Sequence, residues 1–204
     1  MITSTRDAAE ILGVTQRQVQ NAVREGLLAS HRFGNSLGVY ERQVFALRRM
    51  RLAGRRWEGA TLVAALDVLS GLPVTTLHGS QLSRLKARLR TMPDAGLAGH
   101  VLAGKASLYR AGADRGRESD TIFAGQAALV GGGTSVIVEP DANRLVASLG
   151  FTPDPEGNVI AIDGDPRHYD VIAALVYTVY GATRERSAGA RLLRERRSES
   201  LPMR

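Results

Sequence analysis

Residues 13–28 read GVTQRQVQNAVREGLL, and this stretch decides how the first part of the chain folds. Val19, Ala22 and Val23 are spaced i, i+3, i+4, which predicts a short helix with one apolar face. The opposite face is polar and consists of Arg17, Gln20, Asn21 and Arg24, with Gln16 at its N-terminal end. Arginine hydrogen-bonds guanine edges, and glutamine and asparagine hydrogen-bond adenine, so these residue types are typical of a helix that reads DNA bases.

Capping residues predict where this helix and the one before it begin. Ser4 with Asp7, and Thr15 with Gln18, have the spacing of a capping box. Gly13 stands where a helix ends in a left-handed residue. The sequence therefore predicts two helices and a tight turn, at about 5–12, 16–25 and 13–15 respectively.

A β-hairpin and a third helix are predicted next, from LLASHRFGNSLGVYERQVFAL at 27–47. We expect strands at 28–33 and 39–40, with a turn at 34–38 between them. Helix, turn, helix, β-hairpin, helix is the order of a winged helix-turn-helix, which the sequence predicts over residues 1–57. The hairpin would carry three polar side chains towards the DNA backbone or minor groove: His31, Arg32 and Asn35.

The third helix adds to a basic N-terminal region. Val44 and Leu47 are expected to face inward, and Arg42, Arg48, Arg49 and Arg51 outward. The whole chain carries a net charge of +7; residues 1–60 have ten basic and five acidic side chains, whereas residues 131–204 have nine and ten. A basic N-terminal region suggests that the partner is a polyanion. We therefore expect phosphate contacts from Arg48, Arg49 and Arg51.

STRDAAEILGVTQRQVQNAVREGLL at 4–28, the hairpin, and YERQVFALRR at 40–49 resemble the DNA-binding domain of the MerR and excisionase families. The resemblance implies that the groove-reading residues are Gln16, Arg17, Gln20, Asn21 and Arg24, and that Arg32 and its neighbours make wing contacts. A polar helix face is often simply solvated, and some helix-turn-helix modules bind proteins, so both alternatives stay open at this point.

The rest of the chain predicts an α+β fold with a helical connector at 58–125 and a small C-terminal α+β domain at 126–204. Strands are expected at 135–139 and 158–162, with a helix at 140–149 between them. The apolar stretch VIAALVYTVY at 171–180 fits either a self-association surface or burial within its own domain.

Residue types that carry enzyme chemistry are not grouped in this sequence. It has no cysteine, which excludes disulfides and cysteine-ligated zinc. GHVLAGKA at 99–106 matches a phosphate-binding loop except at its last position, where Ala106 replaces the hydroxyl that magnesium needs. Asp163, Asp165 and His168 lie in a predicted turn. We expect no catalytic residues, no metal site and no cofactor.

Most of the chain also resembles actinobacterial helix-turn-helix regulators of the AbiE antitoxin type. The resemblance lies in LSRLKARL at 82–89, VIVEP at 136–140 and GFTPDPEGNVIAID at 150–163. It implies a possible partner, a nucleotidyltransferase toxin.

Together these patterns predict a sequence-specific regulator of transcription, repressor-like or antitoxin-like, that binds double-stranded DNA as a homodimer or higher oligomer. The alternative is an architectural or recombination accessory protein, excisionase-like, that acts as several copies on DNA. The chain starts without a basic and apolar leader, and 171–180 is about half as long as a membrane span. We therefore expect a cytoplasmic, nucleoid-associated bacterial protein.

Overall fold

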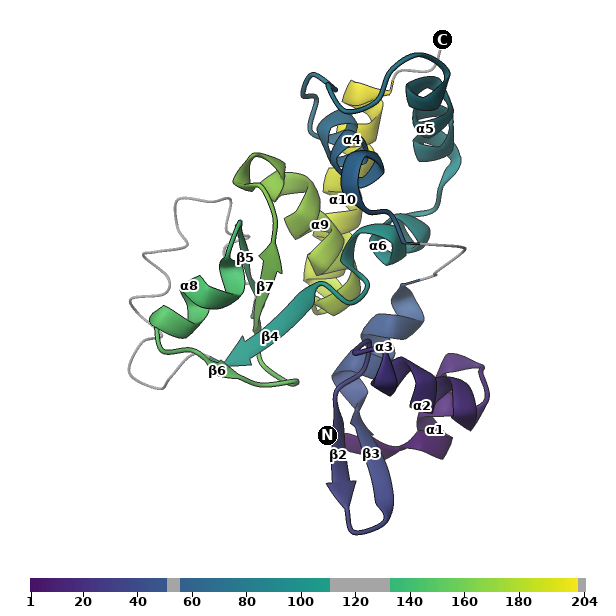
Figure 1. Ribbon diagram of the computed structural model, residues 1–204, viewed down its shortest axis with the longest axis vertical. Helices are drawn as coiled ribbons and strands as arrows, with labels where there is room; N and C mark the ends of the chain where they lie inside the picture. Colours follow the sequence, from purple (N-terminus) through teal and green to yellow (C-terminus); the bar gives the residue numbers. More distant parts are fainter. Residues whose placement is uncertain (51–55, 111–132, 202–204) are drawn as a thin grey trace.

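The computed structural model describes residues 1–50, 56–110 and 133–201, which form a mixed α+β fold (Figure 1). Residues 1–50, here the N-terminal unit, contain β1 (Ile2–Ser4), α1 (Thr5–Leu12), α2 (Gln16–Arg24), β2 (Ser30–Phe33), β3 (Ser36–Tyr40) and α3 (Glu41–Arg49). The other described residues, here the body, contain α4 (Gly59–Leu69), α5 (Gly79–Thr91), α6 (Asp94–Leu102), β4 (Ala106–Arg110), β5 (Ser135–Glu139), α8 (Ala142–Ser148), β6 (Thr152–Pro153), β7 (Val159–Asp163), the 3-10 turn η2 (Pro166–His168), α9 (Tyr169–Tyr180) and α10 (Thr183–Ser200).

The two predicted N-terminal helices are confirmed, together with the turn between them. Ser4 Oγ accepts a hydrogen bond from the backbone N–H of Asp7 at 3.1 Å and so caps α1. Gly13 ends α1 with φ of 68°, a left-handed conformation that a residue with a Cβ adopts only at a cost. α2 therefore starts three residues later, at the angle to α1 that this turn sets.

The N-terminal sheet differs from the prediction in two ways. An unpredicted strand, β1, pairs antiparallel with β3 and makes a three-stranded sheet in the order β1-β3-β2. The hairpin loop is Gly34-Asn35 rather than 34–38, because β2 and β3 pair up to Phe33 opposite Ser36. A two-residue loop keeps both strands paired up to the tip of the hairpin.

The sheet of the body has strand order β5-β7-β4-β6, with β5 and β7 parallel and the other pairs antiparallel. Residues alternate between its two faces. Ile137, Val159 and Ala161 belong to the cluster under α8. Val136, Val138, Ile160 and Ile162 belong to the cluster that includes α9. Figure 1 shows α8 and α9 on opposite sides of this sheet, so both faces are covered.

The predicted connector, residues 58–125, packs against the C-terminal elements within the ranges that the structure describes. β4 pairs with β7 and with β6, and apolar residues of α4, α5 and α6 share one core with α9 and α10. Non-local strand pairing and shared burial make α4–α6 and the C-terminal elements one packed body. Residues 111–125 of the predicted connector and 126–132 of the predicted C-terminal domain lie outside the described residues.

The apolar stretch 171–180 is the helix α9, and it is buried within its own fold. Val171 to Tyr177 are all buried, as is Val179. α10 packs closely on α9 at Gly189, where a Cβ would come within 2.6 Å of the Ala174 carbonyl oxygen. Of the two alternatives for this stretch, the structure supports burial, because α6, α10 and the sheet cover it.

α3 connects the N-terminal unit to the body. Val44 belongs to the small N-terminal core, whereas Ala46 and Met50 belong to the large core of the body. The N-terminal ammonium also forms an ion pair with Glu156. In Figure 1 α3 lies between the two parts of the molecule. None of the helices in the described ranges has both the length and the apolar character that a membrane span needs.

Candidate nucleic-acid interface

The buried side of α2 fixes how the helix is presented. Val19 is fully buried in the N-terminal core, with Ala8, Ala9, Leu28, Val39 and Val44. At the start of the helix the Thr15 N–H donates to Gln18 Oε1 at 2.8 Å, and the Gln18 N–H donates to Thr15 Oγ1 at 3.3 Å. This capping box satisfies two backbone N–H groups that a helix start otherwise leaves free. Packing and capping together turn the opposite face outward.

The outward face of α2 carries the predicted polar row. Arg17 and Arg24 are exposed, and Gln20 and Asn21 are half-buried. Within the described part of the chain, none of these four side chains has a hydrogen-bond or ion-pair partner. The row therefore offers two guanidinium groups and two amides to another molecule.

Gln16 has a structural role that its position in the sequence does not reveal. Its Nε2 donates a hydrogen bond to Thr5 Oγ1 at 2.8 Å. The bond joins the start of α2 to the start of α1. The amide oxygen and the second N–H of Gln16 are not used by this bond, and the side chain is exposed.

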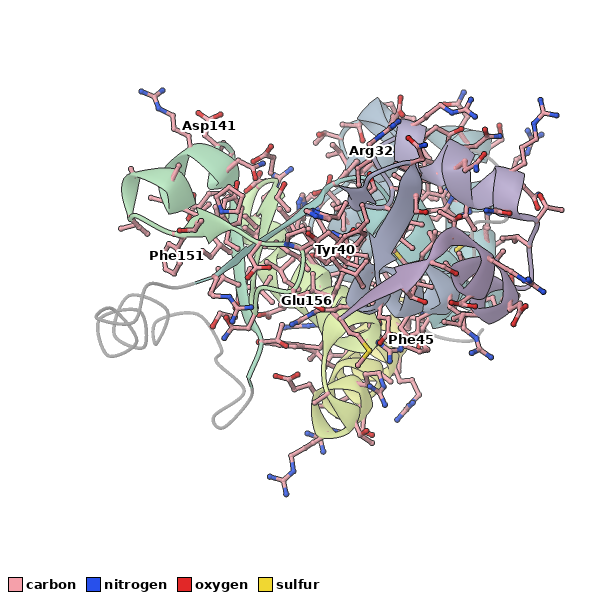
Figure 2. The ribbon with its side chains drawn as sticks, turned by 90° about the horizontal axis from the view of Figure 1, so that it is seen from below. Arg32, Tyr40, Phe45, Asp141, Phe151 and Glu156 are labelled. Carbon is pink, nitrogen blue, oxygen red and sulfur yellow. The ribbon has the colours of Figure 1, made fainter. Side chains whose placement is uncertain are left out.

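The three predicted hairpin residues, His31, Arg32 and Asn35, are all exposed. The hairpin is anchored at its base, where the Ala29 N–H donates to Gln43 Oε1 of α3 at 2.5 Å. Figure 2 shows Arg32 well away from Phe45 and Glu156, which lie where the N-terminal unit meets the body. The hairpin and the polar row of α2 thus belong to the part of the unit that the body does not cover.

Phe33 is a residue of this surface that the sequence did not single out. Its side chain is 57% exposed at the end of β2, next to the hairpin loop. Its ring lies 4.6 Å from the ring of His31, measured between centroids. An aromatic side chain at the tip of a strand would be read from sequence as an ordinary strand residue. The exposure of the Phe33 side chain depends on the pairing register of β2 with β3, which the sequence alone does not reveal.

The arginines of α3 do not all face outward. Arg48 is exposed as predicted, and Arg51 lies outside the described residues. The prediction was wrong for Arg42 and Arg49, which are half-buried against the body. Arg42 Nη1 donates to the Glu156 carbonyl oxygen at 3.3 Å, and Arg49 Nη1 donates to the Val179 carbonyl oxygen at 2.7 Å.

The cause is helix geometry, because residues seven apart lie on one face of α3 and that face packs on α9. Burial lowers the pKa of both Arg42 and Arg49. For Arg49 the neighbouring guanidinium groups of Arg186 and Arg42 lower the pKa further. Arg49 is therefore removed from the surface formed by α2 and the hairpin.

Two segments of the body have sequences that resemble a phosphate-binding loop or a metal site: residues 99–106 and 163–168. Gly99 lies inside α6, and the segment that resembles a phosphate loop runs from helix into strand β4, the reverse of the order that such a loop needs. Asp165 Oδ1 accepts from the Arg167 N–H at 3.0 Å and so starts the turn η2. Neither segment has the arrangement that phosphate or metal chemistry requires.

The structure does bring together an ionic cluster that the sequence could not predict. Asp67 of α4 is buried, and its Oδ1 lies 2.8 Å from His168 Nε2 and 3.2 Å from an Arg167 guanidinium nitrogen. The cluster ties α4 to the start of α9. Among the residues that the structure describes, no three His, Asp or Glu side chains are grouped so as to hold a metal ion.

The site is thus defined by geometry: a helix whose polar row has no partner among the described residues, beside a hairpin with exposed basic, amide and aromatic side chains. No protein-family model, no curated protein and no solved structure matches the chain.

Proposed function

We propose that the chain is a sequence-specific DNA-binding regulator whose N-terminal unit acts as a winged helix-turn-helix. α2 enters the major groove, and the β2–β3 hairpin lies over the adjacent backbone or minor groove as the wing. The observation that carries this proposal is the row Arg17, Gln20, Asn21 and Arg24, which has no partner within the described chain. Bidentate bonds of arginine to guanine, and of glutamine or asparagine to adenine, distinguish one base pair from another.

Charge supports the same partner. Residues 1–60 carry ten basic and five acidic side chains. Arg32 on the hairpin and Arg48 on α3 are exposed on this unit and contact phosphates in the proposal. Each phosphate that they neutralise releases condensed counterions, so the affinity for DNA falls steeply as salt rises.

One recognition helix covers only a few base pairs, so a single unit gives little discrimination. We therefore propose that two or more copies bind repeated half-sites, about one helical turn of DNA apart. α9 does not supply the contact between copies, because its apolar residues are buried within its own fold.

The proposal is tested by selecting genomic DNA fragments with the full chain and with the double variant Arg17→Ala/Asn21→Ala. Wild type should enrich a shared short sequence, because each base contact discriminates by about 1–3 kcal/mol. The double variant should keep weak, salt-sensitive binding and lose the enrichment. Arg144→Ala, an exposed arginine on α8, is the matched control and should select as wild type does. Equal enrichment by the double variant would contradict base reading by α2.

One observation favours a second function, that of an architectural DNA-binding protein. Proteins that bend DNA often insert an apolar side chain between base steps from the minor groove. Phe33 stands 57% exposed beside the basic Arg32, near the hairpin tip. An apolar ring next to a cationic group suits a narrow, negatively charged groove.

Bending is measured by energy transfer between dyes at the two ends of a selected fragment. In the architectural role, the full chain shortens the end-to-end distance and Phe33→Ser abolishes the shortening while binding persists. Leu145→Ser, which changes an exposed apolar residue of α8, serves as the control. Unbent DNA under saturating protein would leave regulation as the proposed role and remove the architectural one.

A further inference from the structure

A pocket of about 390 Å³ lies between α3 and the junction of α9 with α10. From α3 it is lined by Arg42, Phe45 and Arg49, which share one helix face because they are spaced i, i+3, i+7. From the body it is lined by Tyr180 and Glu185, among others. Figure 2 shows Phe45 at this boundary between the N-terminal unit and the body.

Three guanidinium groups gather around this pocket without carboxylate partners. Arg42 and Arg49 donate to the carbonyl oxygens of Glu156 and Val179, as described above, and Arg186 Nη1 donates to the carbonyl oxygen of Gly181 at 2.9 Å. Within the ranges that the structure describes, none of the three forms an ion pair. Half-buried arginines are ordinarily paired with acids, because desolvating an uncompensated charge is costly.

The acid at the pocket already accepts three hydrogen bonds from other groups. Glu185 is buried, and its Oε1 accepts from the Thr134 N–H at 2.9 Å. Its Oε2 accepts from Thr134 Oγ1 at 3.1 Å and from the Ala182 N–H at 2.7 Å. Among the residues that the structure describes, three guanidinium charges face one carboxylate, which leaves two positive charges uncompensated there.

Two further observations indicate that the described residues supply too little negative charge for these cations. Arg42 Nε is buried and has no hydrogen-bond partner among the described residues. Burial lowers the pKa of Arg49, and its neighbours Arg186 and Arg42 lower it further, as expected for like charges held together. A bound anion would relieve both costs.

We propose that this pocket binds a phosphate monoester with a small apolar body. A phosphate monoester carries a charge of about −1.5 to −2 at neutral pH, which matches the two uncompensated positive charges. Guanidinium forks bind phosphate oxygens with paired hydrogen bonds. The volume lies in the range of small-molecule pockets, about 300–1,000 Å³, and Phe45 and Tyr180 supply an apolar wall for the organic part.

The pocket lies between the body and the N-terminal unit, and we propose that this unit binds DNA. A ligand there would contact α3 on one side and the α9–α10 junction on the other, a position from which it could influence the affinity for DNA. Only this consequence rests on the proposed function. Binding of the ester itself is measured without DNA, so a failure of one proposal is distinguishable from a failure of the other.

The test uses phenyl phosphate as the probe, with phenol as its uncharged counterpart, and the full chain. We expect phenyl phosphate to raise the melting temperature of the wild type and to broaden its own ³¹P resonance on binding, and phenol to do neither. Arg49→Gln and Arg186→Gln should each weaken the affinity by about tenfold or more, since each removes a charged donor. Arg144→Gln, an exposed arginine of α8, should bind as wild type does.

Arg186 bonds only to the neighbouring turn, at Gly181 and Thr183, so Arg186→Gln keeps the test valid if Arg49→Gln unfolds the protein. An unbroadened ³¹P line with an unchanged melting temperature would overturn the proposal. Equal binding by Arg144→Gln and Arg186→Gln, whether both strong or both weak, would also overturn it. So would a loss of DNA affinity in Arg186→Gln without any binding of phenyl phosphate, because the cluster would then serve the DNA backbone.

Discussion

The N-terminal unit and the body use their polar side chains in opposite ways. In the body, buried polar groups pair with one another at several places, as in Asp67 with His168 and Glu185 with Thr134. In the N-terminal unit, the polar row of α2 points outward and has no hydrogen-bond or ion-pair partner within the described chain. Burial forces polar groups to pair internally, so the difference teaches where the chain keeps binding capacity for another molecule.

The apolar cores of the two parts also differ, in this case in size. The N-terminal core consists of small side chains, with Leu28 as its largest fully buried member. The body buries both faces of its sheet and all sides of α9. A small core stabilises a small unit only marginally. The N-terminal unit is therefore expected to depend on α3, which reaches into the core of the body.

The largest expected effect is a loss of stability in the body. Gly189→Leu places a side chain where even a Cβ would meet the Ala174 carbonyl oxygen at 2.6 Å and the Tyr177 Cβ at 3.0 Å. α10 must then move off α9, which should cost about 3 kcal/mol or more of unfolding free energy. Denaturant unfolding measures the loss. Ser187→Leu, exposed on the same helix, should cost little, and equal losses would contradict this packing.

The second effect separates the two cores. Val19→Ala removes two buried carbon atoms from the N-terminal core and should cost about 2 kcal/mol there. Hydrogen exchange should then show faster exchange in α1 and α2 and unchanged exchange in β5 and β7. Val14→Ala, at an exposed site, is the control. Faster exchange throughout the molecule would mean that the two parts unfold as one.

The third effect tests the link between the parts. Arg49→Gln removes the hydrogen bond to the Val179 carbonyl oxygen and should cost about 1–2 kcal/mol. Arg48→Gln changes the same charge one residue earlier, on the exposed side, and should stay within about 0.5 kcal/mol of wild type. The two free energies of unfolding are compared directly. Indistinguishable variants would show that Arg49 does not hold α3 to the body.

The smallest effect appears at alkaline pH. Burial raises the pKa of Tyr177, so the folded protein keeps a neutral phenol where the unfolded chain, with a pKa of about 10, releases its proton. The contribution of Tyr177 is complete below about pH 10 and is lost as the pH rises above it. Tyr177→Phe should reduce the loss of stability at alkaline pH, because it removes the group that releases the proton. Identical pH profiles of stability for variant and wild type would contradict this burial.

Local patterns made the proposed interface predictable. The bounds of α1 and α2 follow from capping boxes, a glycine and apolar spacing, all within a few residues of each other. The outward polar row of α2 follows from the same periodicity. The hairpin and the exposure of His31, Arg32 and Asn35 were likewise predictable, although the predicted loop between the strands was too long.

Non-local contacts account for what the sequence did not reveal. β1 exists because Ile2 lies opposite Tyr40, a pairing that no local pattern indicates. Arg49 looks like any outward arginine until α3 packs on α9. The Asp67–His168 bond joins residues 101 positions apart. Each of these depends on which elements meet in space, and that is decided by the whole core.

The most direct test of the central claim maps which region contacts DNA. Amide resonances of the full chain are followed by NMR during titration with a DNA fragment selected by the wild type. The account predicts that shifts concentrate in α2 and the β2–β3 hairpin, while α8 and β5 stay unchanged. Shifts confined to the body, or none on α2, would contradict the claim that its polar row reads DNA.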